Sequence, residues 1–156
     1  MYTASDYIVD FLLSKNINQA FVVTGGACAF VVDAMGRNKE FTYTSFHHEQ
    51  SASMAADAVY RVENSKIGVT VATSGPGATN LITGIACSYF DSIPSIHITG
   101  QVNSKESSKY LEANVRQAGF QETDIVRMVE PITKAAKKVE DFLDLKNTLE
   151  EFYLEA

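Results

Sequence analysis

Short apolar runs alternate with segments of helical pattern along the first hundred residues, and this alternation constrains the fold more than any other feature. Strand-like apolar runs lie at residues 19–26, 40–46, 66–77 and 94–100. Helical patterns lie at residues 3–17, 29–36, 48–62 and 78–90. Continuous apolar strands are typical of a parallel sheet that is covered on both faces. The sequence therefore predicts an α/β fold, a parallel sheet with helices on both faces in three α/β/α layers.

The pattern changes after Gly100. Residues 101–120 are polar and charged, and a loop of this length is usually functional or mobile, or contains a short helix. The sequence then predicts a helix at 122–129 that Pro131 stops, a fifth strand at 132–139 and a last helix at 141–156. No glycine or proline stops this last helix. We therefore expect residues 1–156 to form a single domain that is truncated at its C-terminal end.

Charge and apolar content exclude several classes of partner. The net charge is −6, and the densest basic group is only Lys134, Lys137 and Lys138, which argues against nucleic acid. No apolar run reaches the ~20 residues that span a bilayer, so we expect no membrane partner. The N-terminus lacks a signal-peptide pattern, which indicates a cytoplasmic protein. Cys28 and Cys87 are expected to be packed free thiols.

Polar residues gather where the predicted strands end. Three segments reach the carboxyl edge of the sheet: Gly25-Gly26, His47 to Gln50, and Ser74 to Gly77. Ligands of open parallel sheets bind at this edge, so we expect the three segments to converge on one crevice. Glu49 would lie there, in the first turn of the helix at 48–62.

Several chemistries are conceivable for this edge. A zinc helix motif needs a second histidine four residues after the first, but Ser51 and Ala52 occupy those positions, so no metal ligand is predicted. The stretch "TSGPGATN" lacks the third glycine of a dinucleotide fingerprint and the lysine of a P-loop. Glu49 could be an ordinary solvated helix acid. Alternatively, because mostly small side chains follow it in the helix, Glu49 could meet a ligand and share a proton with a ring nitrogen.

The motifs taken together resemble a known family. They are "GG" at Gly25-Gly26, "HEQSASMAADAVYR", "TSGPGATNLITGI" followed by "DSIP" and "ITGQV", and "GFQETDIV". Their order is similar to that in the N-terminal pyrimidine-binding domain of thiamine-diphosphate-dependent enzymes, and most of all to the acetolactate synthase group. The resemblance covers nearly the whole chain.

The resemblance implies roles for individual residues. Glu49 corresponds to the catalytic glutamate, which bonds N1′ of the aminopyrimidine and favours the imino tautomer that takes the proton from the thiazolium C2. The implied cofactor-binding residues are Gly25, Gly26, Glu49, Pro76 and Asn80. Phe120 and Gln121 would face the substrate, Gln121 with a catalytic role. His48 would be a supporting residue, and His47 and His97 structural ones.

The resemblance also implies partners outside this chain. The family binds the diphosphate and Mg²⁺ with a second domain marked by Gly-Asp-Gly, a sequence that these residues do not contain. The cofactor then lies between two subunits, which implies a homodimer or tetramer and an isolated chain without activity. The implied substrate is a 2-oxo acid, pyruvate in the first place, and binding of FAD stays open.

The sequence departs from the family pattern at two places, and two alternative functions remain open. Thr24 replaces the proline that usually precedes the glycine pair, and the long 101–120 loop leaves the acceptor substrate open. The chain could instead be a stand-alone small subunit of a two-subunit thiamine-diphosphate decarboxylase. It could also be a non-catalytic α/β binding module.

Overall fold

Four parallel strands form one sheet in the computed structural model, which describes residues 1–112 and 115–156. The strands are β1 (Gln19–Val22), β2 (Thr42–Ser45), β3 (Gly68–Ala72) and β4 (Ser95–Thr99). Their order is β2-β1-β3-β4, and all three neighbouring pairs are parallel.

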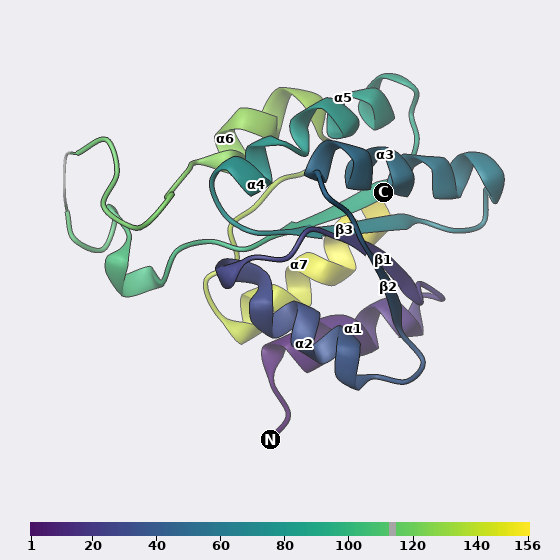
Figure 1. The fold of residues 1–156 in the computed structure, drawn as a ribbon, viewed down its shortest axis with the longest axis horizontal. Helices are drawn as coiled ribbons and strands as arrows, with labels where there is room; N and C mark the ends of the chain where they lie inside the picture. The colour runs from purple at the N-terminus through teal and green to yellow at the C-terminus, as the bar shows by residue number, and fades with distance from the viewer. Residues whose placement is uncertain (113–114) are drawn as a thin grey trace.

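Helices cover both faces of this sheet (Figure 1). One face carries α1 (Ala4–Ser14), α2 (Ala29–Arg37) and α7 (Phe142–Glu155). The other carries α3 (Glu49–Val62), α4 (Pro76–Thr79), α5 (Ile82–Phe90) and α6 (Ile125–Val129). The predicted three-layer α/β/α arrangement is thus confirmed.

Local capping sets where the longer helices begin. Thr3 and Asp6 form a reciprocal capping box at the start of α1. The His48 ring accepts a hydrogen bond from the Gln50 N–H at the start of α3, and Asp141 caps α7 through the Asp144 N–H. Each cap satisfies backbone donors that have no partner within the helix.

The structure corrects two predicted elements. The helix expected at 78–90 is divided into α4 and α5, because the chain tightens at Leu81, whose N–H bonds Ala78 O instead of continuing the α-helical pattern. The fifth strand expected at 132–139 is absent from the part of the chain that the structure describes: a 3₁₀ turn at Glu130–Ile132 leads into an unpaired segment. This segment has three lysines and two alanines, residue types that are depleted in strands.

Three smaller expectations also change. The strands are not all covered on both faces: β3 is fully buried, whereas β2 is an edge strand whose four residues are all exposed. Gly36 lies within α2 rather than ending it. Of the two cysteines, Cys28 is buried as expected but Cys87 is exposed.

The described parts of the long segment, residues 101–112 and 115–120, extend away from the layered body (Figure 1). They contain a short 3₁₀ helix at Ser104–Glu106, which is one of the alternatives that the length of the loop left open. The part of that expectation that concerns residues 113 and 114 lies outside the described residues.

The main core lies between the sheet and α1 and α2, where the most buried side chains include Val9, Leu12, Met35, Val22 and Val69. On the opposite face, Leu81, Ile85 and Val129 form a smaller cluster over Ala72. Among the described residues, no helix has the length and apolar content that a membrane span requires.

Candidate functional site

Glu49 is the most buried carboxylate at the carboxyl edge of the sheet. It is the first residue of α3, directly after the loop that leaves β2, and only 8% of it is exposed. Asn80, at the end of α4, donates a hydrogen bond from Nδ2 to Glu49 Oε2 at 2.9 Å. Two segments that are 31 residues apart therefore meet at this carboxyl group.

The turn after β3 forms the wall beside Glu49. Gly75 has φ +58°, a left-handed conformation that favours glycine, and Pro76 begins α4. A Cβ on Gly77 would lie 2.7 Å from Thr73 Cγ2 and 3.2 Å from Glu49 Oε1. Any larger residue at position 77 would therefore push against the carboxyl group.

The loop after β1 closes a second side of the site. A Cβ on Gly25 would lie 2.5 Å from the Thr73 Cβ, so only glycine allows the two loops to approach this closely. The Ala27 N–H donates to Thr73 Oγ1 at 3.3 Å. Cys28 Sγ donates to Gly25 O at 3.4 Å, and burial raises the pKa of this thiol, which keeps it protonated as a donor. Around Gly26, by contrast, no described residue other than its chain neighbours has a heavy atom within 4 Å of a Cβ position.

The segment before α6 borders the third side. Gln121 has φ +55° and packs its backbone against Gly75: a Cβ on Gly75 would lie 2.6 Å from the Gln121 Cβ. Phe120, its neighbour, is 79% exposed. The structure thus brings Gly25, Glu49, Pro76, Asn80 and Gln121 to one edge of the sheet, with the Phe120 ring facing solvent.

The three histidines are not among the side chains that form hydrogen bonds with the Glu49 carboxyl group in the described part of the chain. His47 and His48 are exposed, and His48 caps α3. The His97 ring lies in β4 between Thr70 Oγ1, at 2.7 Å from Nδ1, and Ser95 Oγ, at 3.0 Å from Nε2. Desolvation lowers the pKa of His97 to about 4.

This arrangement suits proton exchange with a polar ring. A largely buried carboxyl group whose one oxygen is held by an amide can present the other oxygen to a ring nitrogen. Among residues 1–112 and 115–156, no three or more His, Cys, Asp or Glu side chains gather as metal ligands.

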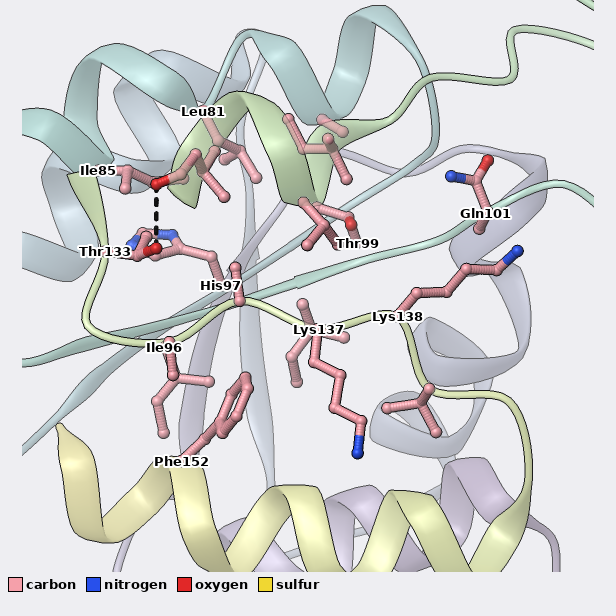
Figure 2. A pocket seen from close by; sticks show the side chains of 18 of the residues that line it. Leu81, Ile85, Ile96, His97, Thr99, Gln101, Thr133, Lys137, Lys138 and Phe152 are labelled. Carbon is pink, nitrogen blue, oxygen red and sulfur yellow. Dashed lines mark hydrogen bonds between the residues drawn. The ribbon is translucent and has the colours of Figure 1, made fainter. Parts of the chain in front are cut away.

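A large cleft lies elsewhere, along the open edge of β4 (Figure 2). Its volume is about 1480 Å³, and its walls include Leu81 and Ile85 above the sheet and Ile96 and Phe152 below it. Glu49, Gly25 and Asn80 do not line it. Polar and charged side chains such as His97, Lys137 and Glu122 also line this cleft. We place the candidate site at Glu49 instead, because its buried carboxyl group and Asn80 meet at the carboxyl edge of the sheet, where ligands of open parallel sheets bind.

Sequence reasoning missed Thr73, Gln101 and Glu122. Thr73 lies close to Gly25 of the loop after β1 and to Gly77 of the turn after β3. Its position directly after the buried β3 run was a sequence signal that could have identified it. Gln101 and Glu122 bind backbone groups of the long loop, and their place beside "ITG" and "GFQ" was the only sequence signal.

Comparison with known proteins agrees with this geometry. Residues 2–128 match the family described as thiamine pyrophosphate enzyme, N-terminal TPP binding domain. The chain is 38% identical over 156 residues to the acetolactate synthase large subunit of Cyanidium caldarium, covering 97% of this chain and 25% of that protein. It is 34% identical over 157 residues to the acetolactate synthase isozyme 3 large subunit of Escherichia coli (strain K12), covering 100% of this chain and 26% of that protein.

A third relative is the chloroplastic acetolactate synthase 1 of Oryza sativa subsp. japonica, 35% identical over 149 residues, with 96% of this chain and 22% of that protein covered. The chain thus spans about a quarter of the length of these relatives. The family match extends from α1 into α6 and includes every residue of the candidate site. The chain belongs to the N-terminal TPP-binding domain family of thiamine pyrophosphate enzymes, in the branch that resembles acetolactate synthase.

Proposed function

We propose that this chain is the pyrimidine-binding part of a thiamine-diphosphate-dependent enzyme that decarboxylates a 2-oxo acid, pyruvate in the first place, and joins the fragment to an acceptor. The observation that carries the proposal is Glu49, a carboxyl group buried at the sheet edge and oriented by Asn80. The relatives' printed name, acetolactate synthase, supports the carboligase class.

The residues of the site fit the aminopyrimidine. Glu49 holds or gives up a proton at the ring nitrogen N1′, and Asn80 keeps its carboxyl group in the orientation that this exchange needs. Gly77 leaves room beside Oε1, and Gly25 lets the first loop close onto Thr73. When bound, thiamine diphosphate supplies the carbon nucleophile that attacks the 2-oxo acid.

The remaining proposed residues surround this contact. Gly26 offers an uncrowded backbone next to the site, and Pro76 fixes the start of α4. Gln121 and Phe120 border the substrate side, Gln121 through its amide and Phe120 through its exposed ring.

The proposed assembly supplies what this chain does not. Thiamine diphosphate and Mg²⁺ would be completed by a diphosphate-binding domain of a second subunit, in a homodimer or tetramer, so the isolated chain would be inactive. We propose further that residues 1–156 are one domain that continues at its C-terminal end, and that the protein acts in the cytoplasm. FAD is compatible with the proposal but no residue described here argues for it.

Glu49→Gln in the full-length protein tests the proposal. Turnover of pyruvate with thiamine diphosphate and Mg²⁺ is expected to fall about 10²- to 10⁴-fold, as for loss of a general acid–base group. The far-UV circular dichroism spectrum should not change, because glutamine keeps the acceptor for Asn80. Glu40→Gln, at an exposed loop position, is the matched control. Unchanged turnover in Glu49→Gln would refute the assigned role.

A further inference from the structure

Glu122 holds two separate parts of the long loop together, at Ser108 and at Gly119. Its carboxylate accepts hydrogen bonds from the Ser108 N–H and Ser108 Oγ, each at 3.0 Å, and from the Gly119 N–H at 3.3 Å. Burial on its own would raise the pKa of Glu122, but these hydrogen bonds outweigh it and lower the pKa. Hydrogen bonds to an ionised carboxylate are about twice as strong as neutral ones, so these contacts hold Ser108 and Gly119 firmly at Glu122.

Gln101 fixes the turn formed by residues 119–123 from the side of the sheet. Its Nε2 donates to Thr123 O at 2.9 Å while its Oε1 accepts from the Val102 N–H at 2.9 Å. A Cβ on Gly119 would lie 2.9 Å from Val102, so the turn 119–123 packs directly on the chain that leaves β4. Residues 119–123 are therefore anchored at both ends.

Between these anchors lies Gln121, in an uncommon backbone conformation. Its φ of +55° is a left-handed value that costs free energy for a residue with a side chain. The residue it meets, Gly75, is left-handed as well, with φ +58°. The fit is close: a Cβ on Gly75 would lie 2.6 Å from the Gln121 Cβ and 2.8 Å from its carbonyl oxygen.

We propose that Glu122 is a positioning residue for the Glu49 site. It fixes the turn 119–123, the turn holds Gln121 on Gly75, and the loop Thr73–Thr79 is thereby held beside the Glu49 carboxyl group. The effect that we expect on the KM for the 2-oxo acid rests on the proposed function. The mechanical link between Glu122 and the loop Thr73–Thr79 does not rest on it.

Hydrogen exchange of the full-length protein without cofactor tests the mechanical link. In Glu122→Gln, one acceptor oxygen becomes an N–H₂ group that faces N–H donors. We expect about tenfold faster exchange in residues 104–111 and also in residues 73–79, the effect of losing roughly one charge-assisted hydrogen bond. Exchange in α1 should stay unchanged, which would show that the domain is still folded.

Glu106→Gln is the matched control, since Glu106 is an exposed acid of the same loop and has no side-chain hydrogen bond to the other described residues. It should exchange like the unsubstituted protein. Faster exchange confined to residues 104–111 would show that Glu122 closes only its own loop and would overturn the proposal. Unchanged exchange in both segments would overturn it as well.

Steady-state kinetics test the link to substrate. We expect Glu122→Gln to raise the KM for the 2-oxo acid about tenfold with kcat within about twofold, and Glu122→Asp to recover part of the loss. An unchanged KM together with faster exchange at 73–79 would overturn the substrate-side role. If Glu49→Gln kept full turnover, the proposed function would fail, while the exchange data would still decide whether Glu122 holds the loop.

Discussion

The contact between Asn80 and Glu49 decides which oxygen of the carboxyl group is available. The amide of Asn80 occupies Oε2, and the missing side chain of Gly77 leaves space at Oε1. A solvated acid at the start of a helix would need neither feature. The interpretation of Glu49 as an ordinary solvated acid in the first turn of a helix therefore does not account for these two features. Its interpretation as a carboxyl group that binds a ligand accounts for both.

His97 is a half-buried residue of β4 whose ring contacts hydroxyl groups rather than charged groups. Thr70 Oγ1 and Ser95 Oγ contact its two ring nitrogens, and desolvation lowers its pKa from 6.5 to about 4. Between these two pH values the unfolded chain binds a proton that the folded chain does not. The contribution of His97 to stability is thus complete above about pH 6.5 and is lost as the pH falls to about 4.

We therefore predict that the free energy of unfolding rises with pH between about 4 and 6.5, and that His97→Asn makes this rise shallower. Urea unfolding at a series of pH values measures the slope. Asparagine retains a partner for Thr70, so the variant should remain folded. His47→Asn, at an exposed position, is the control. Equal slopes for His97→Asn and the unsubstituted chain would contradict the prediction.

At the scale of elements, α3 and α5 pack closely because their facing side chains are small. A Cβ on Gly84 of α5 would lie 1.9 Å from Ser53 Oγ and 2.6 Å from Ser53 Cβ. Asp57 of α3 adds a polar contact by accepting from Ser88 Oγ at 2.9 Å and from Arg61. This close packing holds α3, and with it Glu49, in place over the sheet.

We predict that Gly84→Ala destabilises the chain by roughly 1–3 kcal/mol, the usual cost of forcing extra volume into a packed interface. The matched control is Gly36→Ala in α2, where a Cβ would meet only the Tyr43 ring at 3.8 Å. This control should be stabilising by up to about 1 kcal/mol, because alanine favours the helix. Chemical denaturation of both variants gives the two values, and similar effects for both would show that the α3–α5 contact is not tight.

The same scale shows what sequence patterns predict well. All four strands of the sheet and the helices α1, α3 and α7 were predicted, because long periodic segments with capping residues specify their own structure. The division of 78–90 into α4 and α5 was not, since it depends on how Leu81 packs into the interior. The strand that the sequence predicted at 132–139 is missing from the described part of the chain, and its lysines and alanines argued against it.

At the scale of the whole molecule, the general position of the site was predictable and its contacts were not. The carboxyl ends of parallel strands meet at one edge, so the loops after β1, β2 and β3 had to approach one another. The partners themselves join residues far apart in the sequence: Asn80 with Glu49, Thr73 with Gly25, and Glu122 with Ser108. Side-chain directions of this kind follow from tertiary packing, which a single sequence does not display.

The open edge of β4 is the other feature that only the whole molecule reveals. β4 pairs with β3 on one side, and among the described residues no strand pairs with its other side. Figure 2 shows the cleft there, with the chain around Thr133 to Lys138 running alongside β4. Ile96 and Ile98 are only half-buried at this edge. An unpaired, partly apolar edge strand next to a cleft is a place where a further strand would bind.

This edge supports the proposal that the domain continues past residue 156, and it leads to the last prediction. A longer chain with the residues that follow in its gene should bury Ile96 and Ile98 and raise the thermal midpoint by about 5–10 °C, from a few kcal/mol of added burial. The amides of Ser95–Thr99 should also exchange more slowly. An extension of equal length and scrambled order is the control, since it adds the same residues without the strand pattern. If both extensions leave the midpoint and the exchange of β4 unchanged, the cleft is a stable feature of this domain and its sheet ends at β4.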